Sequence, residues 1–189
     1  DLLLDVAQSG ENVVEREGLS IRHASRFILI GSGNPEEGEL RPQLLDRFGL
    51  SVEVLTPDTV NERIEVIKRR DDYDNHPEEY AATWDKENRK LRNKIQKARK
   101  SLGSITVDSK ILEHCAQICI DLGSDGLRGE LTLVRTARAL AAFNGKERVD
   151  VGHIKTIAPM ALSHRLRRDP LDDAGSGTRV ERSVQKIIG

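Results

Sequence analysis

The amino-acid sequence predicts two successive kinds of structure, an α/β segment over residues 1–56 and an all-helical domain over residues 57–189. Two short β-branched runs, 27–30 and 51–55, have the length and composition of buried strands. Beyond them, apolar residues recur at helical spacing instead. This change of periodicity falls at Thr56, and we place the boundary between the two parts there.

The composition argues against several classes of protein. The chain has 189 residues, a formal net charge of −1 and only 3% aromatic residues. This balance gives no global attraction for nucleic acid or for an anionic membrane, and it offers few rings on which bases could stack. The sequence shows neither an apolar run long enough to cross a bilayer nor a signal peptide.

The two cysteines, Cys115 and Cys119, lie four residues apart in a helical apolar pattern, which predicts that they are core residues. The sequence has no zinc-type spacing and no second cysteine pair, so it indicates a reduced, intracellular protein. The neighbouring His114 lies off the apolar face, and we predict no metal site.

The chain begins with a helical pattern over residues 1–9, without methionine or a cap, and Gly10 is its predicted end. We therefore expect a piece of a longer protein. Two β-prone runs around a glycine-bearing turn then predict a β-hairpin over residues 12–22. This hairpin is either a plain surface element or a mobile loop that projects from a sheet.

The segment 31–49 is the most informative part of the sequence. The strand predicted over 27–30 ends at Gly-Ser-Gly, which places Asn34 just past the carboxyl end of a strand, where ligands bind in open α/β sheets. A short apolar segment follows and ends in the exposed pair Asp46-Arg47. A polar residue after a strand, followed by an acid–arginine pair, is typical of a site that recognises phosphate.

Two helices are predicted next. The first starts at residues 56–59, where Thr or Asp can cap it, and ends at Asn75-His-Pro77, and the second covers 78–102. Residues 86–100 contain eight Lys or Arg against one Glu. This stretch is either a nucleic-acid patch or a solvated helix face, and the second reading is favoured because cations surround most of the helix. The expected apolar stripes are Val60, Ile64 and Ile67 on the first helix, and Trp84, Leu91, Ile95, Ala98 and Leu102 on the second.

A further helix, capped by Asp108 or Ser109, has a predicted apolar face of Ile111, Leu112, Cys115, Ile118, Cys119 and Leu122. The glycine-rich loop 123–129 follows and delivers Arg128 to the start of a helix over 130–143. A cation at a helix start opposes the helix dipole, so we expect Arg128 to have an anionic partner.

The remaining segments are predicted to pack or to lie on the surface. Arg135 and Arg138 are read as surface or interface charges. Asp150 is the expected cap of a helix over 153–167. After a flexible link, an amphipathic helix over 180–188 is suited to dock on the chain's own body or on a neighbour.

This order of features resembles the rear part of an AAA+ ATPase, in which a P-loop core is followed by a helical lid domain. Over nearly the whole chain, the resemblance is closest to the family of the small ATPase subunit (I subunit) of magnesium chelatase. It rests on four stretches: VVEREGLSIRH at 13–23, GSGNPEEGELRPQLLDRFG at 31–49, DGLRG at 125–129 and SHRLRRDPL at 163–171.

The resemblance implies a role for each site residue. Asn34 matches sensor 1 and would orient the attacking water. Arg47 matches the arginine finger, which acts in the nucleotide site of the neighbouring subunit, and Asp46 would support that interface. Arg128 matches sensor 2, through which the lid responds to the nucleotide. The hairpin 12–22 matches the pre-sensor 1 insertion.

The resemblance also implies ATP and Mg²⁺ as cofactors and a homo-oligomeric ring, with a hexamer expected. The implied partners are the D and H subunits of the chelatase, which inserts Mg²⁺ into protoporphyrin IX on the route to chlorophyll and bacteriochlorophyll. The implied location is the bacterial cytoplasm or the plastid stroma, and neither nucleic acid nor membrane insertion is implied.

The sequence departs from this family in one respect. The phosphate-binding loop GxxxxGK[ST] and the Walker B acids do not occur in these residues, and we expect them upstream of Asp1. The chain alone should therefore be inactive. Two alternatives stay open: an AAA+ nucleic-acid remodeller, supported only by the basic stretch 86–100, and a non-catalytic AAA+ scaffold.

Overall fold

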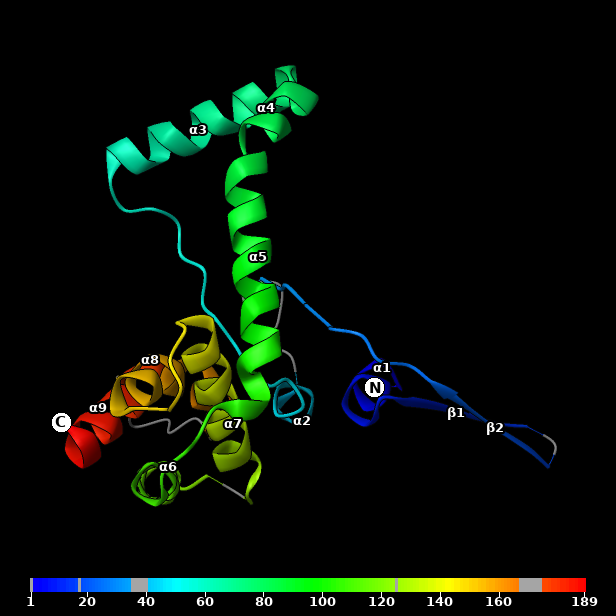
Figure 1. Cartoon of the computed structure of the whole chain (residues 1–189), viewed down its shortest axis with the longest axis vertical. Helices are drawn as coiled ribbons and strands as arrows, with labels where there is room; N and C mark the ends of the chain where they lie inside the picture. The colour runs from blue at the N-terminus through cyan, green and yellow to red at the C-terminus, as the bar shows by residue number, and fades with distance from the viewer. Residues whose placement is uncertain (1, 17, 35–40, 125, 167–174) are drawn as a thin grey trace.

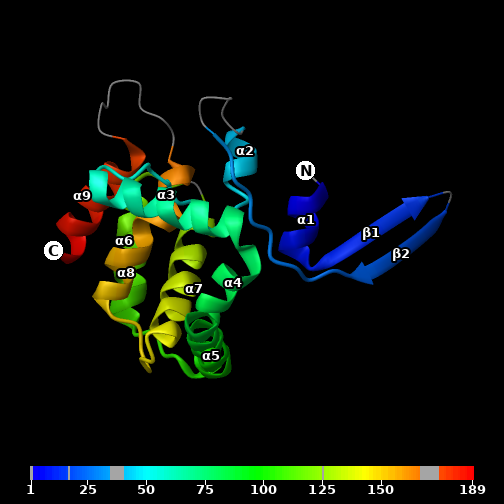
Figure 2. The same cartoon turned by 90° about the horizontal axis from the view of Figure 1, so that it is seen from above.

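The computed structural model describes residues 2–16, 18–34, 41–124, 126–166 and 175–189. Figure 1 shows three parts: an N-terminal helix with a hairpin, a long helical arm, and a helical bundle that contains the C-terminus. Seen from above in Figure 2, the hairpin and the bundle lie on opposite sides of the short helix α2 (Pro42–Leu45).

The predicted N-terminal helix and hairpin are confirmed. Helix α1 (Leu2–Ser9) ends at Gly10, whose φ of +73° suits glycine and whose N–H donates to the Val6 carbonyl oxygen at 2.8 Å. Strands β1 (Glu11–Arg16) and β2 (Leu19–Ala24) then pair antiparallel, with Val13 opposite Arg22. The hairpin projects away from the bundle (Figures 1 and 2).

The strands predicted over 27–30 and 51–55 are not formed, which corrects the sequence prediction. Both runs are extended but carry no ladder, because within the described residues the one sheet is the β1–β2 pair. Ile28 and Val54 are each 89% exposed. Their composition suits a buried strand. However, the β-propensity of a residue reflects how its side chain packs against neighbouring strands, and the described residues supply no strand beside these runs.

The arm consists of α3 (Val60–Asn75), α4 (Pro77–Thr83) and α5 (Asp85–Ser101). Thr59 caps α3 as predicted: its hydroxyl oxygen accepts from the Glu62 N–H at 3.3 Å. Pro77 cannot continue α3, as predicted, and begins α4. The single helix expected over 78–102 is divided at Trp84.

The bundle contains α6 (Ser109–Asp121), α7 (Arg128–Phe143), α8 (Val151–Leu162) and α9 (Ser176–Ile188). Two short 3₁₀ turns, η2 (Leu102–Ser104) and η3 (Ser163–Arg165), precede α6 and follow α8. A single apolar core joins the four helices, with Ile118, Leu133, Ile154, Leu162 and Val180 fully buried. The predicted domain boundary at Thr56 lies in the extended connection that leads to the arm, and the division into two domains stays a prediction.

Most helix predictions in the bundle are confirmed in type and burial. Cys115 and Cys119 are 1% and 0% exposed, whereas Leu112, assigned to the same face, is 47% exposed because it lies at the edge of that face. Helix α9 docks on the chain's own bundle through buried Val180 and Val184. Of the link predicted over 172–177, residues 172–174 lie outside the described residues, whereas residues 176 and 177 already belong to α9, which corrects the prediction there.

Candidate functional site

Asp46 joins two distant parts of the chain. It follows α2, and its carboxylate forms ion pairs with Arg128, the first residue of α7, and with Arg165 in η3. We call Asp46, Phe48, Arg128, His164 and Arg165 the Asp46 cluster. The anionic partner predicted for Arg128 is thus a carboxylate of the chain itself, 82 residues away.

Arg165 fixes the segment after α2 onto the bundle. Its side chain is only 4% exposed. Its guanidinium donates to the backbone oxygens of Asp46 at 2.7 Å, Phe48 at 2.8 Å and Ala161 at 3.0 Å. A planar, always charged fork suits this set of acceptors, because each N–H has a fixed direction. The attachment is extended by the Ser51 N–H, which donates to the Met160 carbonyl at 2.9 Å.

His164 supports the same segment. Its Nε2 lies 3.1 Å from the Phe48 carbonyl oxygen. Burial lowers the pKa of His164 below its ordinary value, and the Arg165 charge lowers it further, against the opposing effects of the Phe48 hydrogen bond and Asp46. A neutral imidazole that faces a carbonyl must carry its proton on Nε2, so His164 donates here.

Gly129 sets how closely α7 approaches the helices beside the cluster. A Cβ atom at this position would lie 2.9 Å from Ser124 Oγ and 3.3 Å from Leu162 Cδ2. Gly129 is buried, so the start of α7 packs against the end of α8 without a side chain between them. The preceding residue, Arg128, keeps 44% of its side chain exposed and can therefore reach a ligand.

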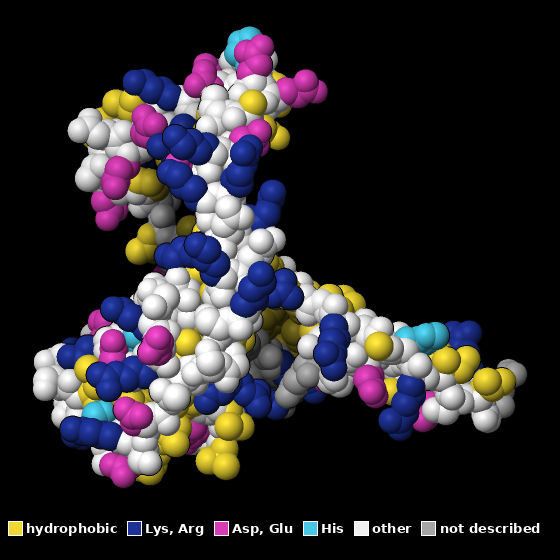
Figure 3. All heavy atoms as spheres, viewed as in Figure 1, with side chains coloured by type: hydrophobic (Ala, Val, Ile, Leu, Met, Phe, Trp, Pro, Cys, Tyr) yellow, Lys and Arg dark blue, Asp and Glu magenta, His cyan; other side chains and the backbone are white. Residues whose placement is uncertain are grey.

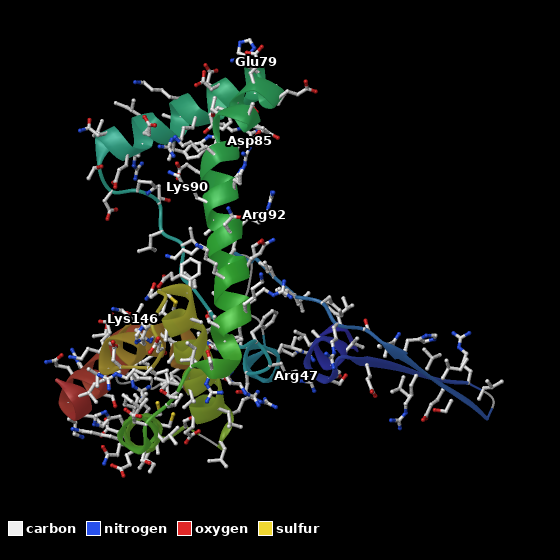
Figure 4. All side chains as sticks on the ribbon, viewed as in Figure 1. Arg47, Glu79, Asp85, Lys90, Arg92 and Lys146 are labelled. Atoms are coloured by element: carbon white, nitrogen blue, oxygen red, sulfur yellow. The ribbon has the colours of Figure 1, made fainter. Side chains whose placement is uncertain are left out.

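The other two predicted site residues lie apart from this ion-pair network. Arg47 turns toward α1, as Figure 4 shows, and forms an ion pair with Asp5. Asn34 is exposed in the extended segment 25–34. That segment passes the cluster at Gly31, where a Cβ atom would lie 3.7 Å from Phe48 Cζ. The structure therefore brings Asp46 and Arg128 together directly, while the role of Asn34 rests on the resemblance.

Sequence reasoning missed Arg165, His164 and Asp5. Arg165 and His164 stand in the stretch 163–171 that carries part of the resemblance, but no local pattern distinguishes a buried arginine from the exposed ones around it. Asp5 looked like an ordinary polar position in a short helix. Their contacts depend on long-range packing that single-sequence periodicity does not report.

The cysteines offer no chemistry to the site. Burial raises the pKa of Cys115 to about 11 and that of Cys119 to about 12, with the Glu130 charge adding to both shifts, so both thiols are protonated at neutral pH. Within the part of the chain that the structure describes, no group of three or more His, Cys, Asp or Glu side chains is placed to hold a metal ion. None of the described helices combines the length and apolar character needed to span a membrane.

Comparison with known proteins identifies the second half of the fold. Residues 112–187 match the family model of the AAA lid domain. An ATPase candidate from Cytophaga hutchinsonii, known from its crystal structure, superposes with a TM-score of 0.67 over 99% of this chain and 60% of its own, at 18% identity. That likeness supports the fold alone.

Sequence relatives extend the comparison to the whole chain. The magnesium-chelatase 38 kDa subunit of Cereibacter sphaeroides is 63% identical over 188 residues, which span 100% of this chain and 56% of that protein. The chloroplastic magnesium-chelatase subunit ChlI of Nicotiana tabacum is 48% identical, over 100% of this chain and 44% of its own length. The chain thus spans about half the length of the curated relatives it matches. Along its whole length the chain is similar to the small subunits of magnesium chelatase, and its fold is the rear part of an AAA+ core with its helical lid.

Proposed function

We propose that this chain is the sensor and arginine-finger part of an ATPase subunit that drives insertion of Mg²⁺ into protoporphyrin IX. The observation that carries the proposal is the identity of 63% along the whole chain to a magnesium-chelatase 38 kDa subunit. In this proposal the subunit forms a ring with further copies and works with the D and H subunits of the chelatase.

The residues of the Asp46 cluster fit part of a nucleotide site. Arg128 is half-exposed, always charged and already paired with an oxyanion, so a phosphate of ATP would be an equivalent partner. When Arg128 turns to phosphate, Asp46 keeps Arg165, which is buried and multiply hydrogen-bonded. The lid then changes its contact with the core as nucleotide binds, without losing its attachment. The phosphate loop and the Mg²⁺ ligands would come from outside the described residues.

Arg47 would act between subunits. Its ion pair with Asp5 leaves the Arg47 side chain one-third exposed, and such a pair is weak enough to be exchanged for a phosphate. In the nucleotide site of the neighbour, it would stabilise charge that develops on the transferring phosphoryl group. Asn34 would orient the attacking water with its amide.

The test uses the complete subunit, its D and H partners and ATP, with hydrolysis and formation of Mg-protoporphyrin measured in parallel. We expect Arg47→Ala to retain nucleotide binding and to lose hydrolysis by about 10³-fold or more, as arginine fingers do. Lys155→Ala, an exposed cation on α8, is the matched control. Hydrolysis without partner-dependent metallation would contradict the proposal, and so would DNA-stimulated hydrolysis.

Mixed subunits test the proposed action in trans. Arg47→Ala subunits, mixed with subunits whose upstream phosphate-binding loop is inactivated, should regain hydrolysis that neither has alone, because in a mixed ring an intact phosphate loop can meet an intact Arg47 of its neighbour. Mixtures that stay inactive would place Arg47 in its own site. The chain of residues 1–189 alone is expected to hydrolyse no ATP, because it contains no phosphate-binding loop.

A further inference from the structure

Helix α1 and the β1–β2 hairpin form one structural unit, residues 2–16 and 18–25, which we call the hairpin unit. The Ser25 N–H donates to the Gly10 carbonyl oxygen at 2.8 Å, which closes the base of the hairpin onto the end of α1. At the same junction, the Glu11 N–H donates to Ser9 Oγ at 3.2 Å. Because hydrogen bonds join α1 to the hairpin on both sides of this junction, a displacement of the hairpin carries α1 with it.

The hairpin unit has one polar contact with the distant part of the fold. Figure 3 shows the hairpin as a narrow projection that joins the remaining surface at its base. Among the described residues, one ion pair or hydrogen bond links the unit to a residue beyond the extended segment 26–34, and it is the ion pair between Asp5 and Arg47. Figure 4 shows Arg47 where α2 faces α1. The Arg47 side chain therefore lies at the junction of two parts of the molecule.

The backbone and the side chain of Arg47 are held by different parts of the chain. The backbone belongs to the segment after α2, which the bundle fixes through the neighbouring Asp46 and the buried Arg165. The Arg47 N–H donates to the Leu44 carbonyl oxygen at 3.1 Å, within the same segment. The guanidinium, in contrast, pairs with Asp5 on α1. A shift of α1 thus changes the surroundings of the guanidinium while the Arg47 backbone keeps its place.

The ion pair between Asp5 and Arg47 can exchange readily. The side chain of Asp5 is 55% exposed and that of Arg47 is 33% exposed. Ion pairs with this much contact with water change an equilibrium by at most about fivefold. A phosphate oxygen would compete with the Asp5 carboxylate for the same N–H groups, since both are oxyanions. The pair therefore biases Arg47 toward its own subunit without locking it there.

We infer that Asp5 is a positioning residue that keeps Arg47 in its own subunit at rest, and that the hairpin unit controls this contact. The inference rests on the proposed role of Arg47 in the neighbouring nucleotide site. When the hairpin unit is displaced, α1 moves with it, Asp5 leaves Arg47, and the guanidinium becomes available to the neighbour's phosphate. A protein that binds the displaced hairpin raises hydrolysis without touching nucleotide, because it favours one of two states.

The first test measures ATP hydrolysis by the full-length subunit. Asp5→Asn removes the charge with almost no change in shape, and it should raise kcat by about two- to fivefold while leaving the dissociation constant for ATP unchanged. Asp5→Glu keeps a carboxylate and should return kcat to near the wild-type value, which a merely structural role of Asp5 would not explain. Glu15→Gln is the matched control, because Glu15 is an exposed carboxylate of β1 in the same unit. Asp5→Asn combined with Arg47→Ala should be as inactive as Arg47→Ala alone.

The second test measures the position of the hairpin unit and involves no nucleotide. Spin labels at Ser20→Cys on β2 and Lys155→Cys on α8 report the distance between the hairpin and the bundle. Cys115 and Cys119 are buried and protonated, so they should not compete for the label. Asp5→Asn should broaden the distribution of distances in the full-length subunit, whereas Asp5→Glu and Glu15→Gln should leave it as in wild type. Thermal unfolding checks that every variant is folded.

The possible failures of the two proposals can be told apart. Unchanged distances in Asp5→Asn would overturn the inference, whatever Arg47 does. Unchanged or reduced kcat in Asp5→Asn, in a subunit that Arg47→Ala inactivates, would also overturn the inference and leave the proposed function intact. Arg47→Ala that retains full hydrolysis would instead overturn the proposed function, and with it the regulation that we infer for Asp5.

Discussion

Two arginines share the Asp46 carboxylate, but their surroundings differ. Arg165 is 4% exposed and binds three backbone oxygens as well, whereas Arg128 is 44% exposed and has no other polar partner among the described residues. A buried charge that loses its partner is costly, while an exposed one returns to water at little cost. We therefore expect Arg165 to be the permanent partner of Asp46 and Arg128 to be the exchangeable one.

Replacement of Arg165 tests this difference. Arg165→Ala should reduce the free energy of unfolding by about 2–3 kcal/mol, because several charge-assisted hydrogen bonds are lost at a buried position. Arg135→Ala, an exposed arginine on α7, should change it by less than about 0.5 kcal/mol. Urea denaturation gives both values, and hydrogen exchange should show faster exchange of the Ser51 amide in Arg165→Ala. An unchanged unfolding curve would contradict the role assigned to Arg165.

The lowered pKa of His164 predicts a pH dependence. Above its ordinary value of 6.5, the imidazole is neutral in both the folded and the unfolded chain, so its contribution to stability is complete. As the pH falls from about 6.5 through the lower folded pKa, the unfolded chain binds a proton that the folded chain resists, and stability decreases. Denaturation at about pH 7.5 and 5.5 should therefore show a smaller pH effect in His164→Gln than in wild type. His23→Gln, on the exposed hairpin, should show the same pH effect as wild type. An equal change in the free energy of unfolding between the two pH values in all three proteins would contradict the role given to His164.

At the scale of elements, local signals predicted the helices well. Helix ends are set by hydrogen bonds or backbone geometry that involve only near neighbours. The four residues predicted to mark such ends act as expected: Thr59, Pro77, Gly10 and Asp150. Asp150 even forms a full capping box, in which its carboxylate accepts from the His153 N–H and the His153 ring accepts from the Asp150 N–H, each at 3.1 Å. The break at Trp84 was not predictable, because the apolar stripe continues through it.

The two caps should differ in what their removal changes. Asp150→Ala removes the cap of α8, a core helix, and should lower global stability by about 1 kcal/mol. Thr59→Ala removes the cap of α3, which buries no residue, so its cost should appear only as faster amide exchange over residues 60–63. Global denaturation midpoints together with residue-resolved exchange distinguish the two. A large global loss in Thr59→Ala would mean that α3 is packed more tightly than its exposure indicates.

At the scale of the whole molecule, the phosphate chemistry assigned to Asp46, Arg47 and Arg128 from the sequence stays a prediction, and their arrangement was not predicted. Their residue types and the resemblance indicated phosphate recognition. Asp46 pairs with Arg128 and Arg165, which lie 82 and 119 residues further along the chain, and no local periodicity encodes contacts at such separations.

The runs 27–30 and 51–55 carry the last prediction. Both have strand composition, yet Ile30 is 88% and Leu55 75% exposed, and the matched relatives are about twice as long as this chain. A strand needs a neighbour to pair with, so we expect both runs to become strands when the rest of such a subunit is present. Hydrogen exchange should then show these amides protected in the full-length subunit and unprotected in residues 1–189 alone. Ile30→Asn should destabilise the full-length protein by about 2 kcal/mol or more, because it would bury an unpaired amide, but should leave the unfolding of the isolated bundle unchanged. Equal protection of the two runs in both proteins would show that they remain extended coil in the complete subunit as well.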